Sequence, residues 1–358
     1  MRMIEPGLRR GRVSVPQSKS HAHRLLIANF LAGDRECLAD AAGDSADIIA
    51  TKRCLRALGS GDPAPILDCG ESGSTLRFLA PVAAALGRTP RFVRAGRLAE
   101  RPFKEYATLA SGVHELAGDV SSQFVTGLLF ALPLLDGDSG IKFTTPLESR
   151  GYVDMTLSVL RRAGIGIAES AEGFSVKGGQ RYRVQPCEVE GDWSAAAFWV
   201  AMNALGSEVA VDGLDGDSAQ PDRAIAALLP ELPETVDVSQ CPDIFPVLTV
   251  AAAGRARRTI FTGIRRLRLK ECDRVAAMED VQRRFGVATE VSENRFVVLG
   301  TGAPFEGGDF CAFGDHRIAM SIAVGATVAR APVRIDNPEC VAKSYPAFFR
   351  DFDSLDAC

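Results

Sequence analysis

The chain has 358 residues, of which 46% are hydrophobic, and its formal net charge is −4. This length allows two or more domains, each with an apolar core large enough to fold without disulfide bonds or a structural metal. The charge is too small to indicate nucleic acid or an anionic membrane as a partner, so any anion-binding site must come from a local cluster of basic side chains.

Nine cysteines are scattered along the chain, and none of them forms a C-x-x-C pair. This pattern predicts neither a disulfide framework nor a zinc site, and it favours reduced thiols in the cytoplasm. No apolar run approaches the roughly 20 residues that cross a bilayer. The basic first residues, MRMIEPGLRRGR, are not followed at once by the apolar core of a signal peptide. We therefore expect a soluble cytoplasmic protein with no membrane partner.

In chain order, six segments share one design, in which Ser, Asp, Cys or Gly residues open an apolar, mostly Ala-rich stretch. Each stretch predicts a helix of about three turns that is apolar on most faces and therefore buried. Their small residues allow close packing between helices. The six segments are residues 18–33, 72–87, 121–135, 191–206, 241–254 and 314–329.

A second, more amphipathic helix follows most of these segments, and most of these helices end in Gly, as left-handed helix ends prefer. Such helices are predicted at residues 47–59, 105–118, 151–164 and 272–286, with less regular ones at 221–232 and 345–355. Strands are predicted from short apolar or alternating runs, for example at residues 141–145, 174–178, 295–300 and 332–336. The sequence thus predicts an α/β (α+β) fold in which a β-α-β-α-β-β unit occurs six times, with some units degraded.

The first turns of the apolar helices carry more polar side chains than capping requires. The first N–H groups of a helix lack partners within it, and Ser or Asp side chains commonly accept their hydrogen bonds. The helix dipole disfavours basic side chains at these positions. Nevertheless, the first turns contain Lys19, Arg24, Arg77, Gln123, Asp243 and Arg317. Helix starts that converge with added Lys and Arg would form a strong anion site.

Nine short motifs occur along the chain in an order that is specific for one family. They are SKSHAHR (18–24), ESGSTLR (71–77), RLAERP (97–102), SSQF (121–124), EGDWS (190–194), PD (242–243), KECDR (270–274), GDHRIAM (314–320) and AKSYP (342–346). Through them the chain resembles the 5-enolpyruvylshikimate-3-phosphate (EPSP) synthase family of enolpyruvyl transferases, from about residue 13 to residue 350.

The resemblance implies two similar domains, each of about three β-α-β-α-β-β repeats, arranged as an inside-out α/β barrel with helix starts facing an interdomain cleft that holds the active site. The implied crossings lie near Pro16 and Gly191. One domain is then residues 1–16 with 191–358, on the phosphoenolpyruvate side, and the other is the inserted residues 17–190, on the shikimate 3-phosphate side. Too few residues separate Arg101 from Ser121 for a full repeat, so one repeat of the inserted domain is expected to be trimmed, with a smaller sheet.

The reaction implied by the resemblance transfers the enolpyruvyl group of phosphoenolpyruvate to the 5-hydroxyl of shikimate 3-phosphate and releases phosphate. It belongs to the shikimate pathway of aromatic amino acid biosynthesis. C3 of the enol gains a proton while the hydroxyl attacks C2, and the tetrahedral intermediate then loses phosphate and a proton from C3. No metal or other cofactor is expected, the two small molecules are the expected partners, and the family expectation is a monomer that glyphosate inhibits in competition with phosphoenolpyruvate.

The resemblance also implies the roles of individual residues. The implied catalytic residues are Lys19, Asp243, Glu271 and Lys343. The implied shikimate 3-phosphate contacts are Lys19, Ser20, Arg24, Ser121, Ser122, Gln123, Ser149, Tyr152, Asp243 and Lys270. The implied phosphoenolpyruvate contacts are Lys19, Gly73, Arg101, Gln123, Arg274, Arg317 and Lys343. Asp243 is the candidate base for the 5-hydroxyl, and Glu271 is the candidate for proton transfer at C3.

Several polar residues of the motifs have structural interpretations. Asp273 suits a helix N-terminus, and Asp243 could likewise cap the helix that follows it. His21 and His23 are expected not to be catalytic. Arg77 is expected to support its loop more than to touch substrate.

Further residues of the motifs are expected to support the site. Asp315 and His316 are expected to orient Arg317, and the family counterpart of Asp192 is mostly structural. Two positions depart from the family pattern: Glu71 stands where Asn is usual beside the phosphate, and Arg266 stands where Asn is commoner.

Two other functions are considered. The enolpyruvyl transferase that acts on UDP-N-acetylglucosamine shares the fold and the chemistry, but it usually carries Lys-Asn near the start and a catalytic cysteine in a mobile loop. Here the start is Lys19-Ser20, and the corresponding stretch RAGRLAERPF has no cysteine. A non-catalytic anion-binding protein of the same fold would be favoured by loss of the four implied catalytic residues, all of which are present.

Overall fold

The computed structural model describes residues 1–357, and these residues form two compact units. The discontinuous unit contains Met1–Ser18 and the chain from Glu190 onward, and the inserted unit is Lys19–Val189. The crossings expected near Pro16 and Gly191 lie close to these bounds.

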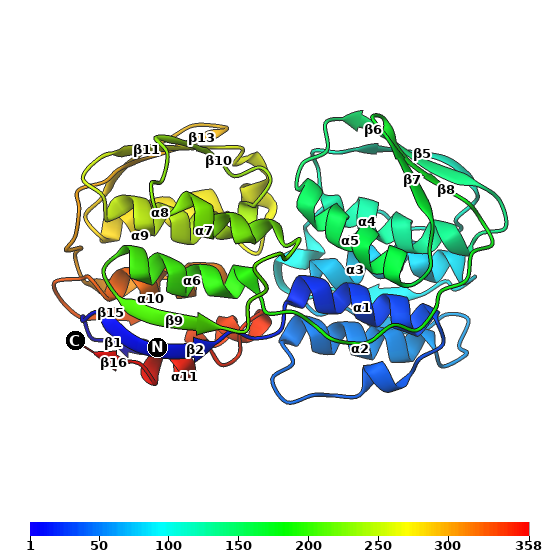
Figure 1. Cartoon of the computed structure of the whole chain (residues 1–358), viewed down its shortest axis with the longest axis horizontal. Coiled ribbons are helices and arrows are strands. Elements are labelled where there is room, and N and C mark those ends of the chain that lie inside the picture. Colours follow the sequence, from blue (N-terminus) through cyan, green and yellow to red (C-terminus); the bar gives the residue numbers. More distant parts are fainter. Residues whose placement is uncertain (358) are drawn as a thin grey trace. The chain divides into compact units, whose positions relative to one another are not determined.

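The inserted unit places a layer of helices beneath a four-stranded sheet (Figure 1). Its helices are α1 (Lys19–Leu31), α2 (Ala46–Leu58), α3 (Gly73–Ala85), α4 (Ser122–Ala131) and α5 (Arg150–Arg162), with the short 3-10 helices η1 (Glu36–Leu38), η2 (Gly96–Ala99) and η3 (Leu132–Leu134). Its strands are β3 (Ile66–Asp68), β4 (Arg91–Val93), β5 (Gly112–Ala117), β6 (Ser139–Thr145), β7 (Ile167–Ser170) and β8 (Gly173–Val176). Strands β3 and β4 pair in parallel, and the second sheet has the order β5-β6-β8-β7.

Close packing of α3 on α4 forms the centre of the inserted unit. Leu76 of α3 and Leu128 of α4 are fully buried. A side chain at Gly127 would place its Cβ 2.3 Å from the carbonyl oxygen of Arg77. Glycine is therefore required for the two helix backbones to approach, because even a methyl group would collide with α3.

The discontinuous unit has three apolar helices in its interior, α6 (Trp193–Ala204), α8 (Phe245–Ala253) and α10 (His316–Ala326), which pack against one another pairwise. Its further helices are η4 (Pro221–Arg223), α7 (Ala224–Leu228), η5 (Pro242–Ile244), η6 (Arg265–Leu269), α9 (Arg274–Arg284), η7 (Pro338–Lys343) and α11 (Phe348–Asp353). Because the helices are apolar on nearly every face, they need cover on all sides.

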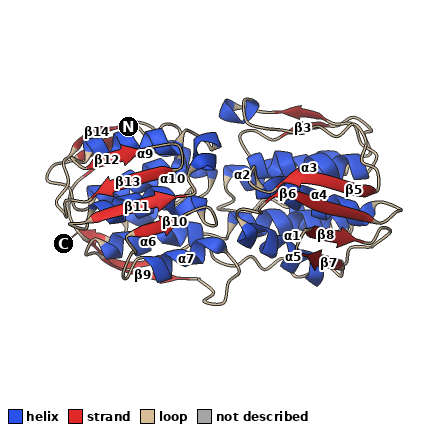
Figure 2. Cartoon of the chain, turned by 90° about the horizontal axis from the view of Figure 1, so that it is seen from above, coloured by secondary structure: helices blue, strands red, loops and turns tan. Residues whose placement is uncertain are grey.

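Three sheets cover these helices (Figures 1 and 2). The strand orders are β1-β15-β14, β10-β11-β13-β12 and β16-β2-β9. The strands are β1 (Arg2–Ile4), β2 (Arg9–Ser14), β9 (Glu208–Asp212), β10 (Thr235–Asp237), β11 (Arg258–Thr262), β12 (Ala288–Val291), β13 (Arg295–Leu299), β14 (Gly308–Phe310), β15 (Val333–Ile335) and β16 (Asp356–Ala357). Helices inside and sheets outside are the predicted inside-out α/β arrangement.

The six predicted apolar helices are confirmed as α1, α3, α4, α6, α8 and α10, and three of the amphipathic ones as α2, α5 and α9. The helix predicted at 105–118 is wrong, because Gly112–Ala117 is strand β5, paired in parallel with β6. The side chains of this stretch alternate between half-buried and exposed, which is the period of a strand. The two-stranded β3-β4 sheet agrees with a trimmed repeat.

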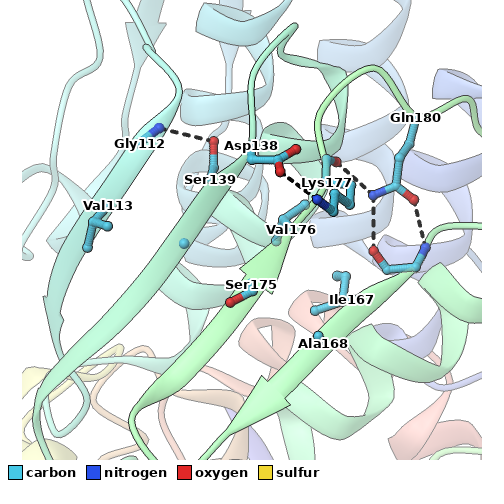
Figure 3. A pocket seen from close by; sticks show the side chains of 12 residues that line it. Gly112, Val113, Asp138, Ser139, Ile167, Ala168, Ser175, Val176, Lys177 and Gln180 are labelled. Atoms are coloured by element: carbon cyan, nitrogen blue, oxygen red, sulfur yellow. Dashed lines mark hydrogen bonds and ion pairs between the residues drawn. The ribbon is translucent and has the colours of Figure 1, made fainter.

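A groove of about 660 Å³ crosses one end of the β5-β6-β8-β7 sheet, where β5, β6 and β7 begin and β8 ends (Figure 3). Its lining includes Val113, Gly140, Ala168 and Ser175, and the Asp138–Lys177 ion pair lies at its edge. None of its lining residues is a predicted site residue. Within residues 1–357, no helix combines the length and the apolar character that crossing a membrane requires.

Candidate active site

In the inserted unit, Lys19 at the start of α1 is held by a carboxylate from α2. Its ammonium group donates to Asp47 Oδ2 at 2.8 Å, and both side chains are largely buried. Asp47 lies in the first turn of α2, where the helix dipole favours a negative charge. Asp47 could not be singled out from the sequence, because an acidic residue in the first turn of an amphipathic helix is common. A substrate anion that binds Lys19 must compete with this carboxylate.

Arg24, on the next turn of α1, is buried and connects α1 to α5. Its Nε donates to Thr156 Oγ1 and its Nη2 to the carbonyl of Tyr152, each at 2.8 Å, and its Nη1 donates to the carbonyl of Ser20. Burial lowers the pKa of Arg24 to about 10, so the guanidinium stays charged at neutral pH. The structure brings Ser20, Arg24 and Tyr152 together, and these bonds engage the guanidinium within the protein.

The start of α3 places the backbone of Gly73 beside two guanidinium groups. Ser72 caps the helix, and a Cβ built on Gly73 would lie 2.7 Å from Arg77 Nη1 and 3.3 Å from Arg101 Nη1. Arg77 donates to Gln123 Oε1 at 2.8 Å and to the carbonyl of Pro102, the residue after Arg101. The helix start, the two arginines and Gln123 therefore meet at one place, which suits a phosphate or a carboxylate.

Helix α4 contributes further polar groups next to the start of α3. Gln123 Nε2 donates to Ser74 Oγ at 3.0 Å, while the side chain of Ser121 caps α4 by accepting from the backbone N–H of Gln123. The predicted support role of Arg77 agrees with its bonds to Gln123 and Pro102. Ser122, also predicted, is buried in the first turn of α4.

Ser149 precedes α5 with a left-handed backbone, φ 55° and ψ 41°, and is buried. A non-glycine residue in this region is uncommon and is found disproportionately at ligand sites. Glu71, the departure from the family pattern, lies against the backbone of Gly96, since a Cβ there would collide with its carboxylate. Glu71 thus contacts the loop that carries Arg101.

In the discontinuous unit, Arg274 is the centre of a charged cluster. Its guanidinium donates to Asp315 and to Asp243 at 2.8 Å each and to Glu271 at 2.9 Å, and its side chain is 1% exposed. The surrounding carboxylates raise its pKa well above its ordinary value despite burial. This arginine is fixed in place by three carboxylates, two of which are predicted catalytic groups.

Asp243 accepts from two further cations, Lys270 at 3.2 Å and Arg317 at 3.0 Å. Its carboxylate is therefore directed at basic side chains, and neither η5 nor α8 has a side-chain cap. Burial lowers the pKa of Lys270, and the charge of Asp243 opposes that effect. The cluster has three cations and three carboxylates, so its groups can rearrange around a ligand without leaving an unbalanced charge.

Asp315 accepts from the backbone N–H of Arg317 and caps α10, while its side chain bonds Arg274. It therefore contacts both the side chain of Arg274 and the backbone of Arg317. Asp273 caps α9 by accepting from the N–H groups of Val275 and Ala276, as predicted. Asp192 caps α6 in the same way.

Lys343 is the last residue of η7, which packs against α10, and it is buried. Arg266 donates to the carbonyl of Ser239 at 2.7 Å, and its charge contributes to the lowered pKa of Lys270.

Asp222, which the sequence did not single out, is buried and accepts from Ser194. Burial, together with the charge of Asp243, raises the pKa of Asp222 to about 6. Among residues 1–357, no group of three or more His, Cys, Asp or Glu side chains is arranged to hold a metal ion.

Comparison with known proteins identifies similar chains. The family model described as EPSP synthase (3-phosphoshikimate 1-carboxyvinyltransferase) matches residues 98–232 and 228–352. A protein named 3-phosphoshikimate 1-carboxyvinyltransferase from Clostridium kluyveri is 38% identical, with 98% of this chain and 96% of the relative covered. A protein of the same name from Clostridium perfringens is 36% identical, with 99% and 97% covered.

Two solved structures share the fold. EPSP synthase from Acinetobacter baumannii has a TM-score of 0.76 at 22% identity, with 99% of this chain and 98% of that chain covered. The enolpyruvyl transferase NikO from Streptomyces tendae has a TM-score of 0.67 at 16% identity, with 99% and 97% covered. At these identities the structural likeness establishes the fold, and the family rests on the sequence relatives.

Proposed function

The chain belongs to the EPSP synthase family, and we propose that it transfers the enolpyruvyl group of phosphoenolpyruvate to the 5-hydroxyl of shikimate 3-phosphate, with release of phosphate. It is a 3-phosphoshikimate 1-carboxyvinyltransferase of the shikimate pathway. The observation that supports the chemistry most directly is that Asp243 and Glu271 are held by one buried arginine, Arg274. The reaction needs one group to take the hydroxyl proton and another to give and take a proton at C3, and two fixed carboxylates can supply both.

In the first step, Asp243 accepts the proton of the 5-hydroxyl as its oxygen attacks C2 of phosphoenolpyruvate. Glu271, in its protonated form, gives a proton to C3 of the enol, so C2 becomes tetrahedral and bears the new ether oxygen, the carboxylate and the phosphate. In the second step, the bond from C2 to the phosphate oxygen breaks, phosphate leaves, and Glu271 removes a proton from C3. The double bond forms again, now in the enol ether.

The basic side chains bind and orient the anions. In the inserted unit, Gly73, Arg101 and Gln123 bind phosphoenolpyruvate at the start of α3, where two guanidinium groups flank the backbone. The shikimate 3-phosphate contacts in this unit are Lys19, Ser20, Arg24, Ser121, Ser122, Gln123, Ser149 and Tyr152. In the discontinuous unit, Asp243 and Lys270 contact shikimate 3-phosphate, and Arg274, Arg317 and Lys343 contact phosphoenolpyruvate. Lys19 contacts both substrates and, with Lys343, balances charge that develops as phosphate departs.

Phosphate release in the presence of phosphoenolpyruvate tests this proposal against its alternatives. We expect release with shikimate 3-phosphate as acceptor and none with UDP-N-acetylglucosamine. Release with only the nucleotide sugar would support the other enolpyruvyl transferase, and binding of both anions without release would support a non-catalytic protein. The relatives in the comparison carry the name of the shikimate enzyme, which favours the first outcome.

Two finer points of the proposal are that the protein acts in the cytoplasm and as a monomer. The cytoplasmic location rests on the odd number and the scatter of the cysteines. Sedimentation of the purified chain would test the second point, and a mass of twice 38.2 kDa would contradict it.

A further inference from the structure

A chain of buried polar side chains joins the N-terminal halves of α1, α2 and α3 in the inserted unit. His23 Nδ1 lies 2.7 Å from Thr51 Oγ1, which lies 2.6 Å from Thr75 Oγ1, which lies 2.7 Å from Ser72 Oγ. Each of the four residues is at most 1% exposed. Helix α2 packs against both α1 and α3, and Figure 1 shows α1 and α2 side by side, so the chain of hydrogen bonds runs across three helices.

The protons in this chain can be placed by counting donors. Thr75 Oγ1 donates to Ser72 Oγ, which also accepts from the backbone N–H of Thr75. A hydroxyl has a single proton, so Thr75 can only accept from Thr51. The proton of Thr51 is then used, and its short contact with the imidazole requires His23 to donate. His23 therefore carries a proton on Nδ1.

The two ends of this chain of hydrogen bonds lie near residues with proposed substrate contacts, Gly73 and Lys19. At one end, Ser72 caps α3 immediately before Gly73 and Ser74. At the other end, His23 lies one turn after Lys19 on α1. Thr51 also contacts the backbone carbonyl of Asp47 at 3.3 Å, and the carboxylate of Asp47 holds Lys19. A change at Thr51 would thus reach the start of α3 through Thr75 and Ser72.

We propose that Thr51 and His23 are positioning residues that fix the start of α3 for the phosphoenolpyruvate anion. This inference rests on the proposed function. Neither residue touches substrate; they act through the Ser72 cap and so set where the N–H groups at Gly73 and Ser74 point. The short hydrogen bonds between these buried hydroxyl groups and the imidazole limit the arrangements that the side chains can adopt, so they hold the helix start in place.

The kinetic test replaces Thr51 with Val, which keeps the shape and removes the hydroxyl. Loss of one buried hydrogen bond from the network behind the start of α3 should raise the KM for phosphoenolpyruvate about five- to tenfold. The KM for shikimate 3-phosphate should change by less than about twofold. Thr51→Ser keeps the hydroxyl and should restore the KM. Thr75→Val interrupts the next link and should reproduce the effect if the first variant does not fold.

The matched control is Thr249→Val in the discontinuous unit, since Thr249 is also fully buried and donates to the carbonyl of Pro246 at 2.8 Å. It should lower the melting temperature to a similar degree and leave both KM values unchanged. The positioning role is contradicted if Thr51→Val lowers only the melting temperature, or if it raises both KM values equally.

Nitrogen NMR of the His23 ring tests the network independently of turnover. We expect the wild-type ring to carry its proton on Nδ1 and the Thr51→Val ring to lose that preference. A wild-type ring protonated on Nε2 alone would overturn the network. An inactive wild-type protein with His23 protonated on Nδ1 would instead contradict the proposed function and leave the network intact.

Discussion

Replacing Gly73 with Ala adds one methyl group at the start of α3. The backbone of Gly73 has no positive φ, so alanine fits the backbone, and the effect must come from the space around the new Cβ. That Cβ would lie 2.7 Å from Arg77 Nη1, 3.3 Å from Arg101 Nη1 and 3.4 Å from Arg101 Nη2. The first distance is too short to persist, so the Arg77 guanidinium must move.

The size of the effect follows from what Arg77 does. Its Nη1 donates to Gln123 Oε1 at 2.8 Å, and a hydrogen bond from a charged donor contributes about 1.5–3 kcal/mol. If the displaced guanidinium loses that bond, and the phosphate group of phosphoenolpyruvate can no longer bind in the same position, the KM for phosphoenolpyruvate should rise about 10- to 100-fold. Inhibition by glyphosate should weaken in parallel, because glyphosate competes with phosphoenolpyruvate for the same site.

The assay is phosphate release at varied phosphoenolpyruvate, with and without glyphosate. Gly166→Ala is the matched control, because Gly166 lies in the loop before β7 of the same unit and its Cβ would meet only Gln180 Oε1, at an ordinary 3.7 Å. The control should have wild-type kinetics. A KM for phosphoenolpyruvate within twofold of wild type in Gly73→Ala, with unchanged inhibition, would show that Gly73 does not line the site.

Three further predictions concern the charged groups. Glu271→Gln should bind both substrates and lose turnover by roughly 100-fold or more; near-normal turnover would assign the C3 proton to another group. Asp315→Ala should raise the KM for phosphoenolpyruvate through loss of the 2.8 Å bond that holds Arg274, while Asp309→Ala, an exposed ion-pair partner of Arg334, should not. For Asp222, the folded-state pKa of about 6 lies above the ordinary 3.8. Its contribution to the free energy of unfolding is therefore complete below about pH 4 and is lost as the pH rises through about 6. The loss amounts to as much as about 3 kcal/mol. Denaturant unfolding of Asp222→Asn across that range should lack this loss, and an unchanged pH slope would contradict the raised pKa.

The sequence predicted the elements well where one pattern dominated. Runs such as 245–253, apolar on every face, could only be buried helices, and α8 is one. The stretch 105–118 failed because Val113 and Leu116 are spaced as on a helix face, whereas pairing with β6 makes Gly112–Ala117 a strand. That pairing is a long-range contact, and local spacing carries no information about it.

The sequence could indicate which residues belong to the candidate site, but it could not indicate which of them form hydrogen bonds or ion pairs with one another. First-turn positions singled out Lys19 and Gln123, since the polar residues there exceeded what capping needs, and the family resemblance added Gly73. The sequence could not show that Asp47 would hold Lys19, or that Asp315 would orient Arg274, because each pair joins different helices. Those pairings follow from the packing of the helices.

The most direct test of the proposed reaction follows both substrates in D₂O by phosphorus NMR, which reports phosphate release, and by proton NMR, which reports deuterium in the vinyl group. If addition and elimination occur through a methyl group at C3, the wild-type protein should convert phosphoenolpyruvate and shikimate 3-phosphate to inorganic phosphate and an enol ether whose vinyl group carries deuterium. Failure to form the enol ether, or an enol ether without deuterium in its vinyl group, would contradict the account.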